Sequence, residues 1–389
     1  MKGQLVMVDM AVSATSPAGS CVRTILCGLP ADIPVSLFSA VWDAAAVAPS
    51  VAYHPVPAPQ RPVVWRYVVF HTRVARRLAV WLKGQRRGDV LVQATQGQWA
   101  GADIVYAHFC HGAYLPELWK QRQWGRARFW LRMLTHAFNA WRERLAFDRA
   151  QLIVAPSLGL QRELMRHYGI DASRIEVLAN PVDIERFTRP AAFDRQAMRA
   201  SLGVKADQIL LAFMALGDFE RKGLGLVLQG LAACAPEQRR RLSLLVIGGQ
   251  ADEIQAFTAQ ARACGVGDQV QFVGMQQDVR PFLWAADVFA FPSAYEIFSL
   301  AILQAAAAGL PVLVSQGLYG AEEFVEPARN GWVAPRSVEG VTVALQDISQ
   351  LTSERMQALS AGASESVRQY SRETFVQRWL ALYRRMGLG

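Results

Sequence analysis

The chain has 389 residues, of which 52% are hydrophobic and 19% charged. This excludes an intrinsically disordered protein and indicates a globular one, long enough for two domains. The five cysteines are scattered without C-x-x-C spacing, which argues against a disulfide framework or a zinc site and favours a reducing compartment. We expect neither a signal peptide nor a transmembrane helix, and therefore a cytoplasmic protein.

The positive charge is confined to the first half of the chain. Residues 1–190 hold 23 Lys and Arg against 13 Asp and Glu, whereas residues 191–389 hold 18 against 19. A half of this kind attracts an anionic membrane surface, a phosphorylated acceptor or nucleic acid. The chain has no nucleic-acid recognition motif, so we expect no nucleic-acid partner.

Strands and helices are expected to alternate from the N-terminus. QLVMVDMAV is a predicted strand and CVRTILCGL a predicted helix. Gly19 lies in the small-residue loop between them, where backbone N–H groups can approach a phosphate, although such a loop is also a common tight turn. ADIVYAHFCHG is a predicted buried strand that runs into His108 and His111. A histidine at the carboxyl end of a parallel strand points into the ligand crevice, or is simply buried.

Two basic stretches with interleaved aromatic residues surround these strands. Trp65–Gly88 places Phe70, Val74 and Leu78 at helical spacing, and Trp119–Arg149 has a similar composition. One interpretation is a pair of helices that lie on an anionic membrane at its inner face. The other is a pair of ordinary surface helices, each packed on a sheet by one side.

We place a domain boundary at Asn180-Pro181, where regular structure should stop and the charge balance changes. The predicted domains are residues 1–182 and 183–369. Residues 370–389 form a predicted C-terminal helix that packs back toward the first domain. In the second domain, the loop from Gly217 holds Arg221 and Lys222 just before a predicted helix. Two cations there suit a diphosphate, unless they are solvated surface charges.

Asp287–Pro335 reads as strand, loop, helix and strand, which is a βαβ unit. Glu296 lies just before the predicted helix, and the backbone N–H groups of Ser299 and Leu300 would be free to bind an anion. The amide of Gln304 follows two turns later. A carboxylate, a phosphate cradle and an amide can therefore converge on one ligand, or Glu296 can merely cap the helix.

These motifs, in this order, resemble glycosyltransferase family 4, whose members are retaining enzymes of the GT-B fold. SPAGS is similar to the family's first glycine-rich loop, IVYAH to its strand with an active-site histidine, and GDFERKG to its Arg/Lys loop. VQFVGM resembles the turn that touches the nucleobase, and AYEIFSLAILQ the E-x7-E region. The resemblance implies an α/β chain of two Rossmann-like, doubly wound domains that face each other across a cleft.

The resemblance also implies the roles of particular residues. Glu296 would contact the transferred sugar and His108 would lie at the reaction centre, with His111 as its substitute. The donor would be a UDP- or GDP-linked sugar, needing no metal or other cofactor, and the acceptor a saccharide or lipid-linked molecule of polysaccharide, lipopolysaccharide or glycolipid synthesis. The implied donor-binding residues are Arg221, Lys222, Ser299, Leu300, Gln304, Gly19 and Gly217, with Gly274 and Phe298 beside them.

Several positions depart from the family pattern. Gln304 replaces the second acid of E-x7-E, Ser299 replaces a glycine, and Pro181 follows Asn180 where a glycine is usual. An amide still bonds to hydroxyl groups, but without the charge-assisted strength of a carboxylate. The alternative interpretation is therefore a catalytically silent protein of the same fold that binds a nucleotide sugar or a partner.

Overall fold

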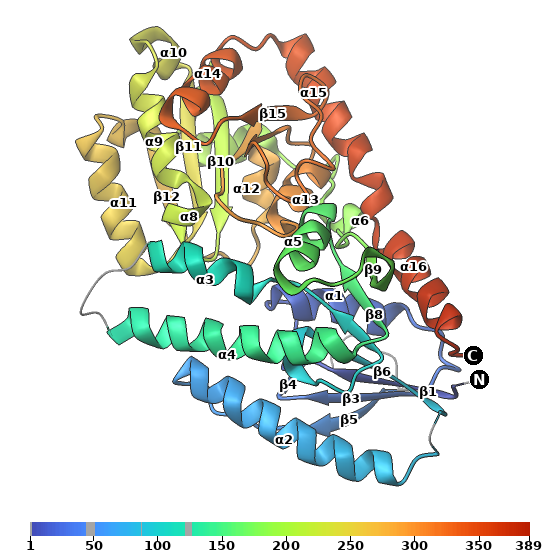
Figure 1. Ribbon diagram of the computed structural model, residues 1–389. Helices are drawn as coiled ribbons and strands as arrows, with labels where there is room; N and C mark the ends of the chain where they lie inside the picture. Colours follow the sequence, from blue (N-terminus) through green and yellow to red (C-terminus); the bar gives the residue numbers. More distant parts are fainter. Residues whose placement is uncertain (1, 44–50, 87, 121–126) are drawn as a thin grey trace. The chain divides into compact units, whose positions relative to one another are not determined.

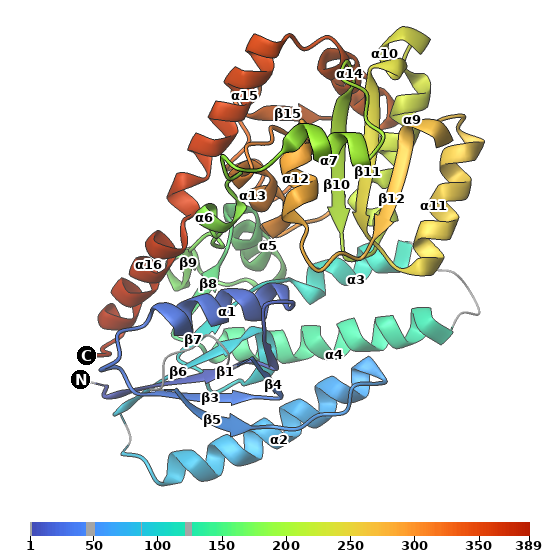
Figure 2. The ribbon, with the colours of Figure 1, turned by 180° about the vertical axis from the view of Figure 1, so that it is seen from behind.

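The structure, a computed structural model, describes residues 2–43, 51–86, 88–120 and 127–389. They form two compact units, Met1–Pro181 with Arg372–Gly389, and Val182–Ser371. Each unit is built around one parallel sheet with helices on its faces (Figures 1 and 2). The predicted α/β fold of alternating strands and helices is confirmed.

The sheet of the first unit has seven parallel strands. Their order is β5 (Val51–Pro55), β3 (Val35–Ser39), β1 (Gln4–Val8), β6 (Val90–Thr95), β7 (Ile104–Tyr106), β8 (Leu152–Ala155) and β9 (Ile175–Val177). β2 (Ala11–Val12) and β4 (Val41–Trp42) extend the ends of β1 and β3 as a separate parallel pair. The central strands are buried on both faces, which explains their nearly continuous apolar sequences.

Helices cover both faces of this sheet (Figures 1 and 2). One face carries α1 (Pro17–Gly28) and α16 (Arg372–Arg385), and the other carries α2 (Val63–Lys83) and α4 (Ala127–Arg149). Right-handed crossovers to opposite sides of β1 require this division. The remaining elements are η1 (Gln96–Gln98), α3 (His111–Lys120), α5 (Leu158–Tyr168) and η2 (Ala172–Arg174).

The predicted amphipathic helix at Trp65–Gly88 is confirmed as α2. Its residues Phe70, Val74 and Leu78 are fully buried, so the helical spacing of the apolar residues marks the face on the sheet. The predicted basic stretch 119–149 corresponds to the end of α3 and to α4, and its residues 121–126 lie outside the described part of the chain.

The sheet of the second unit has six parallel strands. Their order is β12 (Val270–Gly274), β11 (Leu242–Gly248), β10 (Ile209–Ala215), β13 (Val288–Phe291), β14 (Val312–Ser315) and β15 (Gly331–Ala334). α9 (Leu224–Ala233), α11 (Ala251–Ala263) and α14 (Val338–Ser349) lie on one face, and α12 (Arg280–Ala285) and α13 (Leu300–Ala307) on the other. The other helical segments are α6 (Ile184–Phe187), α7 (Arg195–Ser201), α8 (Phe219–Lys222), α10 (Pro236–Arg240), η3 (Gly267–Gln269), α15 (Ser353–Ser366) and η4 (Arg368–Tyr370).

Two local predictions need correction. Gly19 belongs to the first turn of α1, because the Ser16 hydroxyl caps that helix and accepts a hydrogen bond from the Gly19 N–H. Arg221 and Lys222 form the end of the short helix α8 and do not lie in an open loop. The helix predicted at residues 370–389 corresponds to α16, which η4 separates from α15. Among the described helices, none is long and apolar enough to cross a bilayer.

Helix α16 belongs to the core of the first unit. Trp379 and Tyr383 are fully buried, and the Tyr383 hydroxyl donates a hydrogen bond of 2.5 Å to Oε1 of the buried Gln93 on β6. Gly28 of α1 permits this packing, because a Cβ there would lie 2.5 Å from a methyl group of Val376. Helix α16, at the end of the sequence, thus packs against the sheet of the first unit.

We predict that Tyr383→Phe lowers the free energy of unfolding by about 1–3 kcal/mol, because the Gln93 oxygen loses its buried donor. Urea denaturation followed by tryptophan fluorescence measures the change. The double variant Tyr383→Phe with Gln93→Met removes both polar groups and should recover part of the loss. Equal stability of wild type and Tyr383→Phe would contradict this account of the α16 interface.

Candidate functional site

The strand order of the second unit reverses beside β10. The next strand in the chain, β11, lies on one side of β10, whereas β13 pairs with its other side. In open parallel sheets, ligands bind at the carboxyl ends of strands where the order reverses. The segments that leave β10 and β13 therefore meet at this point, and they carry most of the candidate residues.

Helix α8 follows β10 after a short turn. Asp218 adopts a φ of 63° and Gly223, which ends α8, a φ of 85°. A Cβ on Gly223 would lie 2.2 Å from the carbonyl oxygen of Pro292, directly after β13, so only glycine allows this contact. This close approach brings Arg221 and Lys222 next to the segment that contains Glu296.

Glu296 is the centre of a cluster of polar contacts. Its Oε1 accepts hydrogen bonds from Lys222 Nζ and, at 3.1 Å, from the Ser293 hydroxyl, and Arg221 Nη1 lies 3.4 Å away. Arg221 also donates to the Tyr295 carbonyl oxygen and, at 2.7 Å through Nε, to Asp218. The side chains of Arg221, Lys222 and Glu296 are only 12–19% exposed.

The charges of this cluster are balanced within it. Two cations, Arg221 and Lys222, contact two carboxylates, Asp218 and Glu296. Burial lowers the pKa of the Lys222 ammonium, an effect that the neighbouring Glu296 carboxylate opposes. An anion that binds here would exchange one charged partner of Lys222 for another.

Helix α13 begins directly after this cluster, as expected. Ser299 is its N-cap residue but makes no side-chain cap, and the N–H groups of the first turn have no intrahelical acceptor. Gln304 lies further along α13 and is partly exposed. Phe298 is 6% exposed and packs edge to face against Tyr370, so its side chain belongs to the core.

The two glycines among the predicted site residues of the second unit lie at strand ends. Gly217 follows β10, and a Cβ there would lie 2.9 Å from Glu253 Oε2, a carboxylate whose other oxygen accepts from the Phe219 N–H. Gly274 ends β12 with a φ of 67°, which explains its glycine.

In the first unit, His108 follows β7 as predicted. Its ring packs on Tyr106 with 4.0 Å between ring centroids, and Tyr106 donates a 2.8 Å hydrogen bond to Asn180. Burial lowers the pKa of the His108 imidazole to about 3, so the ring is neutral at pH 7. Its Nε2 has no hydrogen-bond partner among the described residues. A neutral ring of this kind can orient a hydroxyl group.

The side chain of His111 is held inside the first unit. Its Nδ1 lies 2.8 Å from Nδ1 of His136, and its Nε2 lies 3.7 Å from Oε1 of the fully buried Glu143. Burial lowers the pKa of His111 to about 3 and that of His136 to about 4. Because its ring is engaged in this way, His111 is a weaker candidate than His108.

Gly19 has a packing reason to be glycine. A Cβ at this position would lie 1.8 Å from the carbonyl oxygen of Ala11 on β2. The first turn of α1 therefore sits directly against the chain that leaves β1. Gly19, His108 and His111 belong to the first unit, and the other predicted site residues belong to the second.

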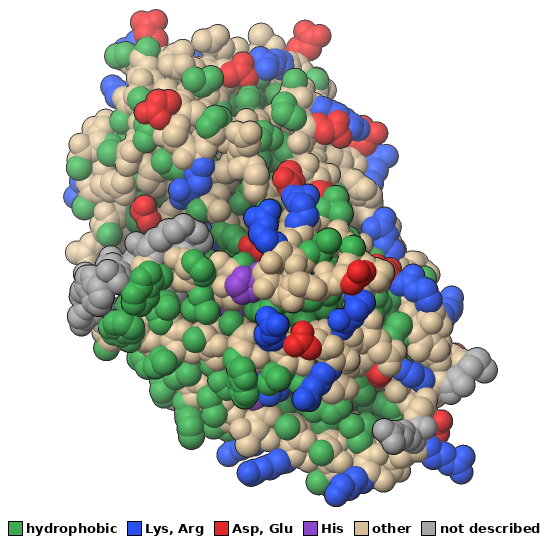
Figure 3. All heavy atoms as spheres, in the orientation of Figure 1, with side chains coloured by type: hydrophobic (Ala, Val, Ile, Leu, Met, Phe, Trp, Pro, Cys, Tyr) green, Lys and Arg blue, Asp and Glu red, His purple; other side chains and the backbone are tan. Residues whose placement is uncertain are grey.

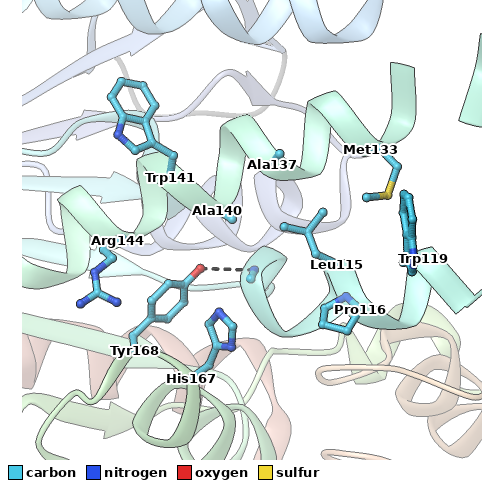
Figure 4. Close-up of a pocket in the computed structure, with 11 residues that line it drawn as sticks. Leu115, Pro116, Trp119, Met133, Ala137, Ala140, Trp141, Arg144, His167 and Tyr168 are labelled. Carbon is cyan, nitrogen blue, oxygen red and sulfur yellow. Dashed lines mark hydrogen bonds between the residues drawn. The ribbon is translucent and has the colours of Figure 1, made fainter. Parts of the chain in front are cut away.

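An open hollow of about 760 Å³ lies between α3, α4 and α5 of the first unit (Figure 4). Its lining is mostly apolar, and Arg144 and His167 lie at one end of it. The lining residues are Gly112, Leu115, Pro116, Trp119, Met133, Ala137, Ala140, Trp141, Arg144, His167 and Tyr168. This hollow was not predicted, because the sequence pattern of each helix does not show how the three helices pack together.

The sequence also gave no indication of several residues that shape the two sites. Asp218 and Ser293 bind Arg221 and Glu296, and Glu143 with Tyr168 supports the start of α3. The only signal for Ser293 was its place just after a predicted strand. For Glu143, an acid among basic residues of an amphipathic helix, there was no signal.

Both halves of the chain match known protein families. Residues 18–186 match the family model described as "Glycosyltransferase Family 4", and residues 208–351 match "Glycosyl transferases group 1". The two matched segments contain His108, Arg221, Lys222, Glu296 and Gln304. The chain belongs to glycosyltransferase family 4.

Relatives support this family assignment. D-inositol 3-phosphate glycosyltransferase of Saccharomonospora viridis is 33% identical over 233 residues, 57% of this chain and 52% of that protein. Lipopolysaccharide glucosyltransferase WaaG of Escherichia coli is 30% identical over 203 residues, 50% of this chain and 53% of the relative. The matched region thus spans about half the length of these curated relatives.

Solved structures confirm the fold. WaaG has a TM-score of 0.76 at 19% identity, covering 97% of this chain and 99% of WaaG. Anabaena HepE, solved in complex with UDP-glucose, has a TM-score of 0.74 at 18% identity, covering 98% and 99%. The predicted GT-B fold of this family 4 chain is therefore confirmed.

The buried cluster around His111 makes the stability of the protein dependent on pH. Burial raises the pKa of Glu143 from its ordinary 4.5 to about 8, so between these values the unfolded chain releases a proton that the folded protein keeps. Stability therefore falls as the pH rises through this window. His111 and His136, whose pKa values are lowered, act in the opposite direction but only below pH 6.5. Above pH 6.5 the effect of Glu143 remains alone.

We predict that, because of Glu143, the free energy of unfolding falls by about 2 kcal/mol as the pH rises from 6.5 to 8. Urea denaturation at both pH values should show this loss in the wild type and a smaller one in Glu143→Gln. Glu354→Gln, which removes an exposed carboxylate, serves as the control and should retain the wild-type pH dependence. The same loss in Glu143→Gln as in the wild type would refute the prediction.

Proposed function

We propose that the chain is a retaining glycosyltransferase that moves a sugar from a nucleotide-diphosphate donor to a saccharide or lipid-linked acceptor. The observation that carries this proposal is the cluster of Arg221, Lys222 and Glu296 at the reversal of strand order, in a chain of family 4. Departure of the leaving group places negative charge on the diphosphate. Fixed cations and a helix N-terminus stabilise that charge, so we propose that no metal is needed.

Each residue of the second unit then has a role. Arg221 and Lys222 bind the diphosphate, and the N–H groups of Ser299 and Leu300 bind phosphate oxygens at the start of α13. When Lys222 turns to the diphosphate, Glu296 becomes available to the hydroxyl groups of the sugar. Gln304 is proposed to bind the ribose hydroxyls. Gly217 and Gly274 are proposed to line the diphosphate and the base, and uracil is the first base to test because HepE was solved with UDP-glucose.

The first unit is proposed to hold the acceptor. His108 would orient a hydroxyl group at the reaction centre, because its ring is neutral and its Nε2 has no partner within the described chain. Gly19, in the first turn of α1, would lie beneath the phosphates. The apolar hollow beside α3 is consistent with an acceptor that carries a lipid.

A second candidate function is nucleotide-sugar binding without transfer. Gln304 favours it, because an amide replaces the family's second acid at this position. The two functions differ in their need for Glu296. Transfer is supported if the wild type turns over donor and a folded Glu296→Ala variant binds donor without turnover. Binding alone is supported if the wild type itself shows no turnover.

We predict that Arg221→Ala abolishes transfer and weakens nucleotide binding but still folds, with its free energy of unfolding lowered by about 1–3 kcal/mol because Asp218 and the Tyr295 carbonyl oxygen lose a donor. The loss of transfer is expected because a diphosphate loses one of its two cations. A thermal-shift panel with UDP, GDP, ADP and CMP identifies the nucleotide, and turnover of the matching nucleotide sugar measures activity.

Arg240→Ala is the matched control, because Arg240 is a 71% exposed cation on α10 that pairs with Glu237. It should bind and turn over donor like wild type. Wild-type activity in Arg221→Ala would remove this arginine from the donor site. A wild type that shifts with none of the nucleotides would refute the donor class.

We further propose that a surface formed by α2 and α4 rests on an anionic membrane. Exposed apolar side chains gather on these helices (Figure 3), namely Val63, Trp65, Val80, Trp130, Leu131, Leu134 and Trp141. Exposed cations lie on the same helices, among them Arg73, Arg76, Arg77 and Lys83. Aromatic rings and cations together are typical of helices at a membrane interface.

Flotation with liposomes that contain anionic lipid tests this surface. We predict that the wild type floats at low salt, less at high salt, and that Trp130→Ser with Leu134→Ser reduces the floated fraction several-fold because apolar contact is lost. Val343→Ser is the control, since Val343 is 65% exposed on α14 of the other unit. A wild type that stays unbound at low salt would exclude membrane binding.

A further inference from the structure

The start of helix α3 is capped by a residue distant in sequence. The four residues before the helix, Ala107 to Cys110, include no Ser, Thr, Asp or Asn, the residue types that usually cap a helix. Instead, Oε2 of Glu143 on α4 accepts a 2.9 Å hydrogen bond from the N–H of His111, the first residue of α3. Glu143 is 0% exposed, so this cap is entirely interior.

Tyr168, the last residue of α5, completes the cap. Its hydroxyl donates a 2.7 Å hydrogen bond to the same Oε2 of Glu143 and accepts one of 3.3 Å from the Gly112 N–H. Figure 4 shows the tyrosine hydroxyl directed at that backbone. A Cβ on Gly112 would lie 2.8 Å from this hydroxyl and 2.2 Å from His167 Nε2, so the fit depends on glycine.

The capped turn directly follows the segment that carries His108. The N–H of Ala107 binds the Val154 carbonyl oxygen at 2.8 Å, which fixes the start of this segment to the sheet. Gln96 supports the middle of this segment. In the amide orientation that satisfies both its oxygen and its nitrogen, the Gln96 oxygen accepts hydrogen bonds from the Phe109 N–H at 2.7 Å and from the His108 N–H at 3.3 Å. Glu143 fixes its far end at His111. The backbone of His108 is thus held between sheet, Gln96 and Glu143.

We propose that Glu143 is a positioning residue for His108: by capping α3 it fixes the backbone of residues 107–111 and thereby the direction of the His108 imidazole. This inference rests on the proposed function, in which His108 contacts the acceptor or the transferred sugar. Tyr168 acts with Glu143, because it holds the carboxyl group and the next backbone N–H together.

The surroundings of Glu143 make its effect dependent on pH. Titratable groups face it from each neighbouring element: His111 on α3, Cys110 before it, Tyr168 and Glu163 on α5, and Tyr67 on α2. His136 is linked to it through His111. A glutamine at position 143 keeps an acceptor for both donors but cannot ionise, whereas leucine keeps only the bulk.

The experiment compares the full-length wild type with Glu143→Gln, Glu143→Leu and Tyr168→Phe. The matched control is Asp148→Asn, an exposed carboxylate on the same helix that pairs with Arg144. Steady-state kinetics give kcat and KM from pH 6 to 9. NMR of protein labelled with ¹⁵N in its histidine rings, with His108 assigned through His108→Gln, reports on the ring itself and does not require turnover.

We expect Glu143→Leu to lower kcat about tenfold or more and to shift the His108 resonances, while nucleotide binding by the other unit stays within about twofold. Glu143→Gln should keep most of the activity at pH 6.5 and lose the alkaline change in kcat that ionisation of Glu143 is expected to cause in the wild type near pH 8. Tyr168→Phe should fall between the two, and Asp148→Asn should match the wild type.

Unchanged kcat and unchanged His108 resonances in folded Glu143→Leu would overturn the proposal. If Glu143→Leu does not fold, a pH profile of Glu143→Gln identical to that of the wild type overturns it instead. A wild type that is inactive with every donor refutes the proposed function, and the His108 resonances then still decide whether Glu143 positions this ring.

Discussion

The pairing of β10 with β13 is the constraint on which the donor side of this protein depends. The two strands are remote in sequence, and only their parallel register brings their carboxyl ends together. Gly223 and Pro292 then come into direct contact, so that Lys222 and Arg221 reach Glu296. Without this contact the same residues would be ordinary surface charges, each worth little to binding or to stability.

The first unit uses a similar arrangement with different chemistry. There, too, the functional segment leaves the carboxyl end of a strand, β7, and an acid from another element fixes it. Glu296 is partly exposed and ion-paired, whereas Glu143 is fully buried and binds backbone N–H and a phenol. The exposed acid suits ligand exchange, and the buried one suits a fixed backbone. Both units therefore place an acid at the end of a parallel strand.

Much of this was predictable from the sequence, because apolar runs and helical spacing record burial directly. The strand ILLAFMA is buried at every residue, and α2 buries the residues that its spacing marked. Arg221, Lys222 and Glu296 were recognisable as a motif. The short helix α8 and the Glu143 cap were not, because each depends on contacts with residues far along the chain. A residue pattern indicates which face is buried, but it does not say which buried polar groups meet.

The balanced charges around Glu296 have a consequence for selectivity. Because Lys222 already has an anionic partner, a small anion such as orthophosphate must compete with a carboxylate that is permanently at hand. A nucleotide sugar replaces that partner at both ends, with phosphates for Lys222 and hydroxyl groups for Glu296. We therefore expect the site to discriminate against the free phosphate that is abundant in cells, and to bind a nucleotide sugar more tightly than the nucleotide alone.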